Sequence, residues 1–304
     1  MELKNFDELL KMLPRDRRVR AVVAGADCEN LLQAVFQAQR DGFIQPVLVG
    51  DRARVITLLD QLGLRDEPYT LVELIPGQNA SKVAVDIINA GEADILVRGR
   101  VLAHDLMLQV MDKRTGLYDG RMISHVALAS LPDYPKLLAL SDMAVMVQPD
   151  IGKKKAMIQN TVEALQVLGY EDPKLALLAL AEQENFHSKD TMDAQLLVTE
   201  QERNHFVDAT LWGPITYDLV FSKTFAKRKA YDCPYCGGGF DAIIAPDVTL
   251  ANTLVKCWLM HSNCEVGGVL MGTRVPVAFS NRGISVREHY LSLALATIMF
   301  FNKK

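Results

Sequence analysis

Short apolar segments alternate with longer amphipathic segments along almost the whole chain. A strand that is buried on both faces of a parallel sheet is continuously apolar, and the stretch between two such strands must be long enough for a helical crossover. The pattern therefore predicts an α/β protein with mostly parallel sheets. We expect strands at 19–25, 45–50, 70–75, 93–99, 123–130, 175–180, 206–211, 241–246 and 267–272, and amphipathic helices at 28–41, 79–91, 152–169 and 248–261.

The sequence also predicts two domains. Two turn glycines, Gly116 and Gly120, precede a new series of strands. The last predicted helix, at 285–299, is apolar enough to pack against the first part of the chain. We therefore expect the chain to return to the first domain after an inserted one. The expected domain one comprises 1–121 and 283–304, and the expected domain two comprises 122–282.

The composition excludes several classes of function. Of the 304 residues, 49% are hydrophobic and 23% are charged, as in a folded globular protein. The formal net charge is −4 and no basic stripe occurs, which argues against a nucleic-acid-binding protein. There is no run of 18 apolar residues and no apolar signal-peptide core, so no membrane partner is expected. The five cysteines lack disulfide-framework spacing, which favours a cytoplasmic protein.

The stretch CPYCGGG resembles both a zinc knuckle and a redox-active cysteine pair. The candidate metal ligands are Cys233, Cys236, Cys257, His261 and Cys264. Four of them would meet around tetrahedral zinc if the helix at 248–261 returned to this loop; the alternative is that the helical cysteine and histidine face the core. A redox role is less well supported, because a reactive pair lies at a helix start, whereas glycines and a predicted strand follow here.

A candidate anion site precedes the last predicted helix. Backbone N–H groups at a helix start, together with the Arg282 guanidinium, would bind an oxyanion beside Gly283. Glu288 follows in the first turn and is a candidate base. The alternative for Glu288 is a capping box, because Ser285 precedes it in the pattern S-x-x-E.

Three further stretches contain candidate ligand-binding residues, either at the ends of predicted strands or within them. The stretch 267–280 has the glycines of a loop that approaches a ligand closely, with Pro276 before a short strand. Arg98 and Arg100 end a predicted strand, where α/β sheets place their ligands, although two solvated arginines fit the pattern as well. His125 lies in an apolar run, where a histidine buried in the core is the alternative to a ligand or a base.

Taken together, these features resemble the phosphate acetyl/butyryltransferase family, and its phosphate butyryltransferase branch most closely. The resemblance extends over nearly the whole chain, and it depends on the order and spacing of the matches. The best-matching stretches are MISHVAL (122–128), Met157-Ile158-x-Asn160, Gly213-Pro214 with Asp218, Asn252 and Lys256 in LANTLVK, GGVLMGTRVPV (267–277), and Arg282 before the last helix.

The resemblance implies a fold like that of isocitrate and isopropylmalate dehydrogenases, with two α/β domains and a cleft between them, in a homodimer or higher homo-oligomer. It implies transfer of an acyl group, butyryl-like in the closest branch, between coenzyme A and inorganic phosphate, without a metal or a bound cofactor. The implied partners are acyl-CoA, phosphate and acyl phosphate. In this chemistry a carboxylate takes the proton of the coenzyme A thiol, and the thiolate attacks the acyl-phosphate carbonyl.

The resemblance also implies roles for residues of this chain. Arg282 matches the phosphate-contacting arginine of the family, Glu288 its acidic base, and Asn281 the serine that precedes the arginine. The implied substrate-binding residues are Arg98, Gly99, Arg100, Ser124, His125, Gly272, Ser280 and Gly283.

The chain departs from the family pattern at several positions. Leu108 and Tyr118 align with two family arginines, for which Arg100, Arg114 and Arg121 are near enough in sequence to substitute. At CPYCGGG the family typically has Ser-Pro-Val-Ala-Gly, so both cysteines replace small residues, which favours an ordinary turn over zinc or redox chemistry.

Two other functions stay open. The missing arginines, with Asn281 in place of serine, favour a non-catalytic homologue that binds acyl-CoA or acyl phosphate. A metal- and NAD-dependent decarboxylating dehydrogenase of the same fold class would need clustered aspartates. Asp190 and Asp193 are the closest pair in the predicted inserted domain.

Overall fold

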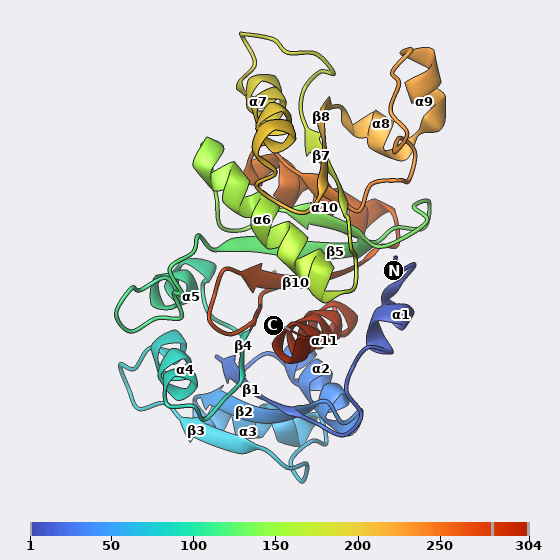
Figure 1. Cartoon of the computed structure of the whole chain (residues 1–304). Helices are drawn as coiled ribbons and strands as arrows, with labels where there is room; N and C mark the ends of the chain where they lie inside the picture. Colours follow the sequence, from blue (N-terminus) through green and yellow to red (C-terminus); the bar gives the residue numbers. More distant parts are fainter. Residues whose placement is uncertain (1, 281–282, 303–304) are drawn as a thin grey trace. The chain divides into compact units, whose positions relative to one another are not determined.

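The computed structural model describes residues 2–280 and 283–302, and its internal contacts divide the chain into two compact units. Unit 1 comprises Met1–Glu8 and Ser124–Val266, and unit 2 comprises Leu9–Ile123 and Gly267–Lys304. The short helix α1 (Phe6–Leu10) includes Glu8 and Leu9, between which the chain first passes from unit 1 to unit 2 (Figure 1). No helix in the described part of the chain is both long and apolar enough to cross a membrane.

Unit 2 contains a mixed sheet with the strand order β3-β2-β1-β4-β11-β10. All neighbouring strands in it are parallel except β10 and β11, which pair antiparallel. In the pairing of β1 with β2, Val19 lies opposite Ile44, and both side chains are fully buried. The strands are β1 (Val19–Ala24), β2 (Ile44–Gly50), β3 (Thr70–Glu73), β4 (Ile95–Arg98), β10 (Glu265–Met271) and β11 (Val277–Ala278).

The helices of unit 2 are α2 (Glu29–Arg40), α3 (Arg52–Gln61), α4 (Ala80–Asn89), α5 (Ala103–Val110) and α11 (Val286–Asn302). Three of them, α2, α3 and α4, connect these strands as crossovers, α5 follows β4, and α11 follows the last strand. Asp51 and Asn79 cap α3 and α4 by accepting backbone N–H bonds from the first turn, as short polar side chains do at helix starts. The last helix, α11, packs side by side with α2 (Figure 1), and its residues 289–299 are buried.

The strands of unit 1 follow one another in the order β5-β6-β9-β7-β8 and are mostly parallel. Only β5 and β6 pair antiparallel among its described neighbours. Its strands are β5 (Ser124–Ser130), β6 (Leu138–Ser141), β7 (Lys174–Leu178), β8 (Thr210–Ile215) and β9 (Ala242–Ile244). Its helices are α6 (Ile151–Val167), α7 (Lys189–Asn204), α8 (Tyr217–Phe221), α9 (Lys223–Arg228) and α10 (Val248–His261).

A buried ion pair lies at one end of the unit 1 sheet. Lys136 Nζ is 2.6 Å from Asp241 Oδ1, and the two side chains are only 5% and 3% exposed. Lys136 also donates to the Gly239 carbonyl oxygen at 3.0 Å, and Asp241 accepts the backbone N–H of Lys174 at 2.7 Å. These extra hydrogen bonds compensate part of the cost of removing both charges from water.

The predicted α/β class with mostly parallel sheets is confirmed. Eight of the nine strands expected from apolar runs lie within about two residues of the observed ones, and the short strand expected after Pro276 is β11. The strand expected at 206–211 begins later, at Thr210. The reason is that Gln201 donates to the carbonyl oxygens of Val207 and Ala209, which holds this segment in a loop after α7.

The two units differ in part from the expected domains, and the domain assignment stays a prediction. The expected boundary at 121/122 lies next to the Ile123/Ser124 junction. The return to unit 2 occurs at Gly267 rather than at 283, because β10 pairs with β11 and β11 pairs with β4. Residues Met1–Glu8 belong to unit 1, since the Leu3 carbonyl accepts the Leu137 N–H and the Leu3 N–H binds the Tyr170 hydroxyl.

Candidate active site

A pocket of about 290 Å³ lies in unit 2, where the chain leaves β1 and β4. Because these strands are parallel neighbours, their carboxyl ends meet at one edge of the sheet, which is where α/β folds bind ligands. Five residues of the predicted site line this pocket, namely Arg98, Gly99, Arg100, Ser280 and Gly283. Asp27, Cys28, Leu31 and His289 complete the lining.

Gly99 allows the two strand ends to approach closely. A Cβ atom at this position would lie 2.2 Å from the Gly25 carbonyl oxygen and 2.6 Å from that of Ala24. The Gly99 N–H donates to Ala24 at 3.0 Å, and the Arg100 N–H donates to Gly25 at 2.7 Å. Only glycine fits this contact, so the residue sets the position of the arginines on either side of it.

Arg98 is a buried cation at the end of β4. Its side chain places Nη1 2.8 Å from the Ser280 carbonyl oxygen and Nη2 3.3 Å from that of Val101. The guanidinium carbon lies 4.8 Å from the centre of the Phe279 ring. With the residue 5% exposed, the guanidinium is fixed in orientation and its charge is poorly screened by water.

Arg100 provides a second, more accessible cation. Its Nη1 lies 3.4 Å from Asp27 Oδ2, with the arginine side chain 64% exposed. Arg54 Nη1 approaches the same carboxylate oxygen at 3.8 Å. Exposed pairs of this kind contribute about 0–1 kcal/mol, so the pair with Asp27 holds Arg100 only weakly.

His289 lies beside Ser280 and was not predicted from the sequence. Its Nδ1 is 3.1 Å from Ser280 Oγ, and both residues are more than nine-tenths buried. Burial, followed by the positive charge of Arg98, lowers the pKa of the imidazole to about 4. His289 is therefore neutral near pH 7.

Acidification is expected to destabilise the protein through His289. In the unfolded chain its pKa returns to about 6.5, so between about pH 6.5 and 4 the unfolded chain binds a proton that the folded one does not. The free energy of unfolding therefore falls as pH falls through this window, by up to about 3 kcal/mol. Urea unfolding at about pH 7 and about pH 4.5 measures the change. In His289→Asn, which cannot titrate, the dependence on pH is expected to be flatter; an unchanged slope contradicts the assignment.

The first turn of α11 forms the predicted capping box. The Ser285 N–H donates to Glu288 Oε2 at 2.6 Å, and the Glu288 N–H donates to Ser285 Oγ at 3.4 Å. Glu288 is half-buried and is not among the residues that line the pocket. Asn281 and Arg282 lie outside the described residues.

The other residues implied as substrate-binding lie outside this pocket. Ser124 and His125 begin β5 of unit 1, where the Ser124 hydroxyl accepts from Asn160 at 2.8 Å and the His125 N–H donates to Asp142 at 3.0 Å. Gly272 has a φ of +81°, and a Cβ there would lie 2.4 Å from the Met122 carbonyl oxygen. This close approach accounts for the glycine without a ligand.

The positions of the missing family arginines are also defined. Leu108 is 55% exposed on α5, and Tyr118 forms an isolated bridge with Thr273. Of the three arginines near enough in sequence to substitute, Arg100 is the one that the structure places among the described lining residues of the pocket. Arg121 instead pairs with Asp119 at 2.8 Å.

The CPYCGGG loop is a tight turn packed into unit 1. Gly237 and Gly238 have φ values of +72° and +111°, and added Cβ atoms would lie 2.5 Å from Lys223 and 2.8 Å from Pro135. Cys236 is buried in the core of the unit. The glycines are thus explained by packing and backbone conformation.

The thiols of this loop lack the features of a metal or redox centre. Burial raises the pKa of Cys236 to about 12 and also raises that of Cys233, which disfavours a reactive thiolate. Cys257 is exposed, whereas Cys264 is buried. Within 2–280 and 283–302, no three His, Cys, Asp or Glu side chains come together in a set that could hold a metal ion.

The aspartates considered for a dehydrogenase are paired with groups of the chain itself. Asp193 Oδ2 accepts from Lys154 Nζ at 2.9 Å and also binds Lys189. Asp190 accepts the Leu180 N–H at 2.6 Å. Two lysine ammonium groups thus pair with Asp193, and a backbone N–H binds Asp190.

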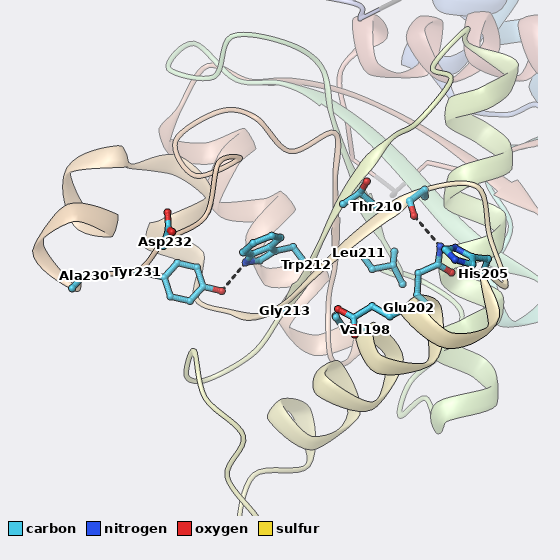
Figure 2. Close-up of a pocket in the computed structure, with 12 residues that line it drawn as sticks. Val198, Glu202, His205, Thr210, Leu211, Trp212, Gly213, Ala230, Tyr231 and Asp232 are labelled. Atoms are coloured by element: carbon cyan, nitrogen blue, oxygen red, sulfur yellow. Dashed lines mark hydrogen bonds between the residues drawn. The ribbon is translucent and has the colours of Figure 1, made fainter.

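A larger pocket, of about 540 Å³, lies along β8 of unit 1 (Figure 2). Trp212 and Tyr231 line it, and the indole N–H donates to the tyrosine hydroxyl at 2.9 Å. Glu202, His205 and Asp232 contribute exposed polar groups. Gly213, part of the Gly213-Pro214 stretch of the family resemblance, lines this pocket, whereas none of the predicted site residues that the structure describes does.

Comparisons with known proteins agree with the sequence motifs. A family model described as "Phosphate acetyl/butaryl transferase" matches residues 73–297. A phosphate acetyltransferase of Thermotoga maritima is 29% identical over 293 residues, which cover 96% of this chain and 99% of the relative. A phosphate butyryltransferase of Clostridium beijerinckii is 30% identical over 301 residues, which cover 99% of each chain.

The fold agrees as well. The crystal structure of a branched-chain phosphotransacylase from Enterococcus faecalis V583 has a TM-score of 0.79 and 26% identity, and the match covers 93% of this chain and 99% of that one. The resemblance inferred from the sequence is thereby confirmed. Because the family model matches more than half of this chain, the chain belongs to the phosphate acetyl/butyryl transferase family and is an acyltransferase.

Proposed function

We propose that the protein transfers a short-chain acyl group, butyryl-like rather than acetyl, between coenzyme A and inorganic phosphate. The observation that carries the proposal is the pocket of unit 2, in which a buried guanidinium and an accessible one flank Gly99. A buried cation of fixed orientation, as Arg98 is, suits a phosphate group and the charge that develops during acyl transfer, and Arg100 adds an accessible positive charge. No bound cofactor is required, since coenzyme A is itself a substrate.

In the proposed reaction, Glu288 takes the proton from the coenzyme A thiol. The thiolate sulfur then forms a bond to the carbonyl carbon of the acyl phosphate, the carbonyl–oxygen bond to the phosphate breaks, and inorganic phosphate leaves. A free thiol titrates at about 8.5, so a nearby base increases the thiolate fraction near neutral pH. Arg98 and Arg100 bind the phosphate group in this scheme, together with Arg282 and Asn281.

The remaining implied residues complete the proposed substrate site. Ser124, His125, Gly272, Ser280 and Gly283 are proposed to contact acyl-CoA or acyl phosphate. We further propose an isocitrate-dehydrogenase-like arrangement of two domains with a cleft between them, in a homodimer or higher homo-oligomer in the cytoplasm. Holding both substrates together replaces a bimolecular encounter, which gives positioning a large share of the rate enhancement.

Release of coenzyme A from acyl-CoA substrates tests the function. Purified protein is incubated with acetyl-, propionyl-, butyryl-, isobutyryl- or valeryl-CoA, with and without phosphate, and the free thiol is measured. We expect phosphate-dependent release that is fastest with the four-carbon substrates. Release that is fastest with acetyl-CoA contradicts the butyryl-like preference, and no phosphate-dependent release with any of the five overturns the proposal.

Arg98→Lys is expected to raise the KM for phosphate about 10-fold or more. Lysine keeps the charge, but its single ammonium cannot hold the Ser280 carbonyl and present a flat fork of donors at the same time. The matched control is Arg100→Lys, for which we expect a change within about threefold because that side chain is exposed. Steady-state kinetics with varied phosphate measure both; equal effects at the two positions contradict the distinction.

The alternative function is non-catalytic binding of acyl-CoA or acyl phosphate. It is favoured by the capping contacts of Glu288 and by the absence of an arginine at Leu108 and Tyr118. It predicts acyl-CoA binding without turnover, and binding that Glu288→Gln leaves unchanged. Calorimetry beside the thiol assay distinguishes the two functions.

A further inference from the structure

The carbonyl oxygen and the hydroxyl of Ser280 both have partners among the residues of the unit 2 pocket. Its carbonyl oxygen accepts from Arg98 Nη1 at 2.8 Å, and its Oγ lies 3.1 Å from His289 Nδ1. All three residues line the pocket and are less than 10% exposed. The hydroxyl is therefore held by His289 in the same residue whose carbonyl binds the guanidinium, unlike a serine that rotates freely in water.

The imidazole beside this hydroxyl is neutral. Among the described residues, the charged or titratable groups that line the pocket with it are Arg98 on β4, Arg100 after β4, and Asp27 and Cys28 after β1. Burial and the nearby Arg98 charge both disfavour protonation of His289. A neutral imidazole carries one N–H and one acceptor nitrogen, so its tautomer decides which way the Ser280 proton points.

The two tautomers have different consequences for an anion. If Nδ1 carries the proton, it donates to Ser280 Oγ, and the hydroxyl proton is available to a ligand oxygen. If Nδ1 is the unprotonated nitrogen, the Ser280 hydroxyl donates its hydrogen bond to Nδ1, and Ser280 presents only lone pairs to the pocket. A phosphate oxygen requires donors, so its binding selects the tautomer with the proton on Nδ1.

We propose that His289 is a positioning residue for phosphate binding, which makes the Ser280 hydroxyl a hydrogen-bond donor to the phosphate group beside Arg98. The inference rests on the proposed function, which supplies phosphate as the ligand. His289 acts through Ser280 and transfers no proton in the reaction. The other substrate, acyl-CoA, does not bind through this hydroxyl in the proposal.

A double-mutant cycle on Ser280 and His289 tests the proposal. A hydrogen bond to a charged group corresponds to about 10- to 100-fold in affinity, so Ser280→Ala is expected to raise the KM for phosphate by that factor. His289→Leu is expected to do the same, and the double variant to do no worse than either alone. The KM for acyl-CoA is expected to stay within about twofold in all three. His289→Asn, whose amide N–H approximates the Nδ1 donor, is expected to retain most of the phosphate affinity.

Several outcomes overturn the inference. They are additive effects of the two substitutions, parallel increases in both KM values, and a His289→Asn variant as impaired as His289→Leu. Thermal unfolding identifies variants that do not fold; if His289→Leu is one of them, Ser280→Ala and His289→Asn decide the question.

Binding of inorganic phosphate, measured by calorimetry, separates this inference from the proposed function. If the wild-type protein shows no phosphate-dependent turnover, the proposed function fails. The inference is then decided by the dissociation constant for phosphate. Weaker binding by Ser280→Ala than by wild type supports it, whereas unchanged binding, or no binding by wild type, overturns it.

Discussion

Replacing Glu288 by glutamine is expected to lower kcat about 100-fold or more, while the first turn of α11 stays capped. A capping box accepts glutamine as well as glutamate at N3, the third residue of the helix. The side-chain oxygen of glutamine therefore still accepts the Ser285 N–H. It cannot take a proton from the coenzyme A thiol. The measurement is the initial rate of phosphate-dependent thiol release at saturating substrates.

The matched control is Ser285→Ala, which removes the other half of the same capping box. Here the carboxylate is retained and the cap is lost, so we expect a loss of about 1 kcal/mol in stability and a kcat within about twofold of wild type. Urea unfolding and the thiol assay on both variants separate the two roles. Similar losses of kcat in both variants mean that Glu288 acts through the cap and not as the base.

Replacing Lys136 by methionine is expected to lower the free energy of unfolding by about 3–5 kcal/mol. The substitution keeps most of the side-chain volume but leaves the Asp241 carboxylate buried without its cation. One hydrogen bond, from the Lys174 N–H, remains and does not replace the lost charge. Urea denaturation near pH 7 measures the difference.

A neighbouring pair provides the control for this experiment. Lys174 Nζ pairs with Asp172, whose side chain is 60% exposed, so Lys174→Met is expected to cost about 0–1 kcal/mol. In the Lys136→Met background, Asp241→Asn is expected to recover part of the loss because it removes the uncompensated charge. If Lys136→Met and Lys174→Met lower the free energy of unfolding equally, burial of the ion pair is not what makes Lys136 important for stability.

The sequence predicts strands well where burial is two-sided and crossovers are helical. It missed β6, whose four buried residues follow β5 as an antiparallel neighbour with no amphipathic stretch between them. It placed β8 too early because the apolar residues Phe206 and Val207 belong to a loop that the Gln201 side chain holds. Apolar character alone does not distinguish these cases.

The site was predictable to the extent that it depends on local geometry. Arg98, Gly99 and Arg100 follow from their place at a strand end, and the Glu288 cap follows from its spacing. His289 could not be predicted, because its partner is a serine that comes close only when β11 and α11 are folded. The zinc interpretation considered for CPYCGGG used glycines that the structure explains by contacts with Lys223 and Pro135.

The division of the chain into units has a consequence for the order in which it folds during synthesis. The chain passes from one unit to the other at Glu8/Leu9, Ile123/Ser124 and Val266/Gly267, so neither unit is a continuous segment. Once Val266 has left the ribosome, every residue of unit 1 is available for folding, but β1 to β4 still lack β11 and the helix that packs on α2. Until α11 emerges, the apolar face of α2 is exposed. A nascent chain that pauses in this interval therefore presents more apolar surface to a chaperone than the finished protein does.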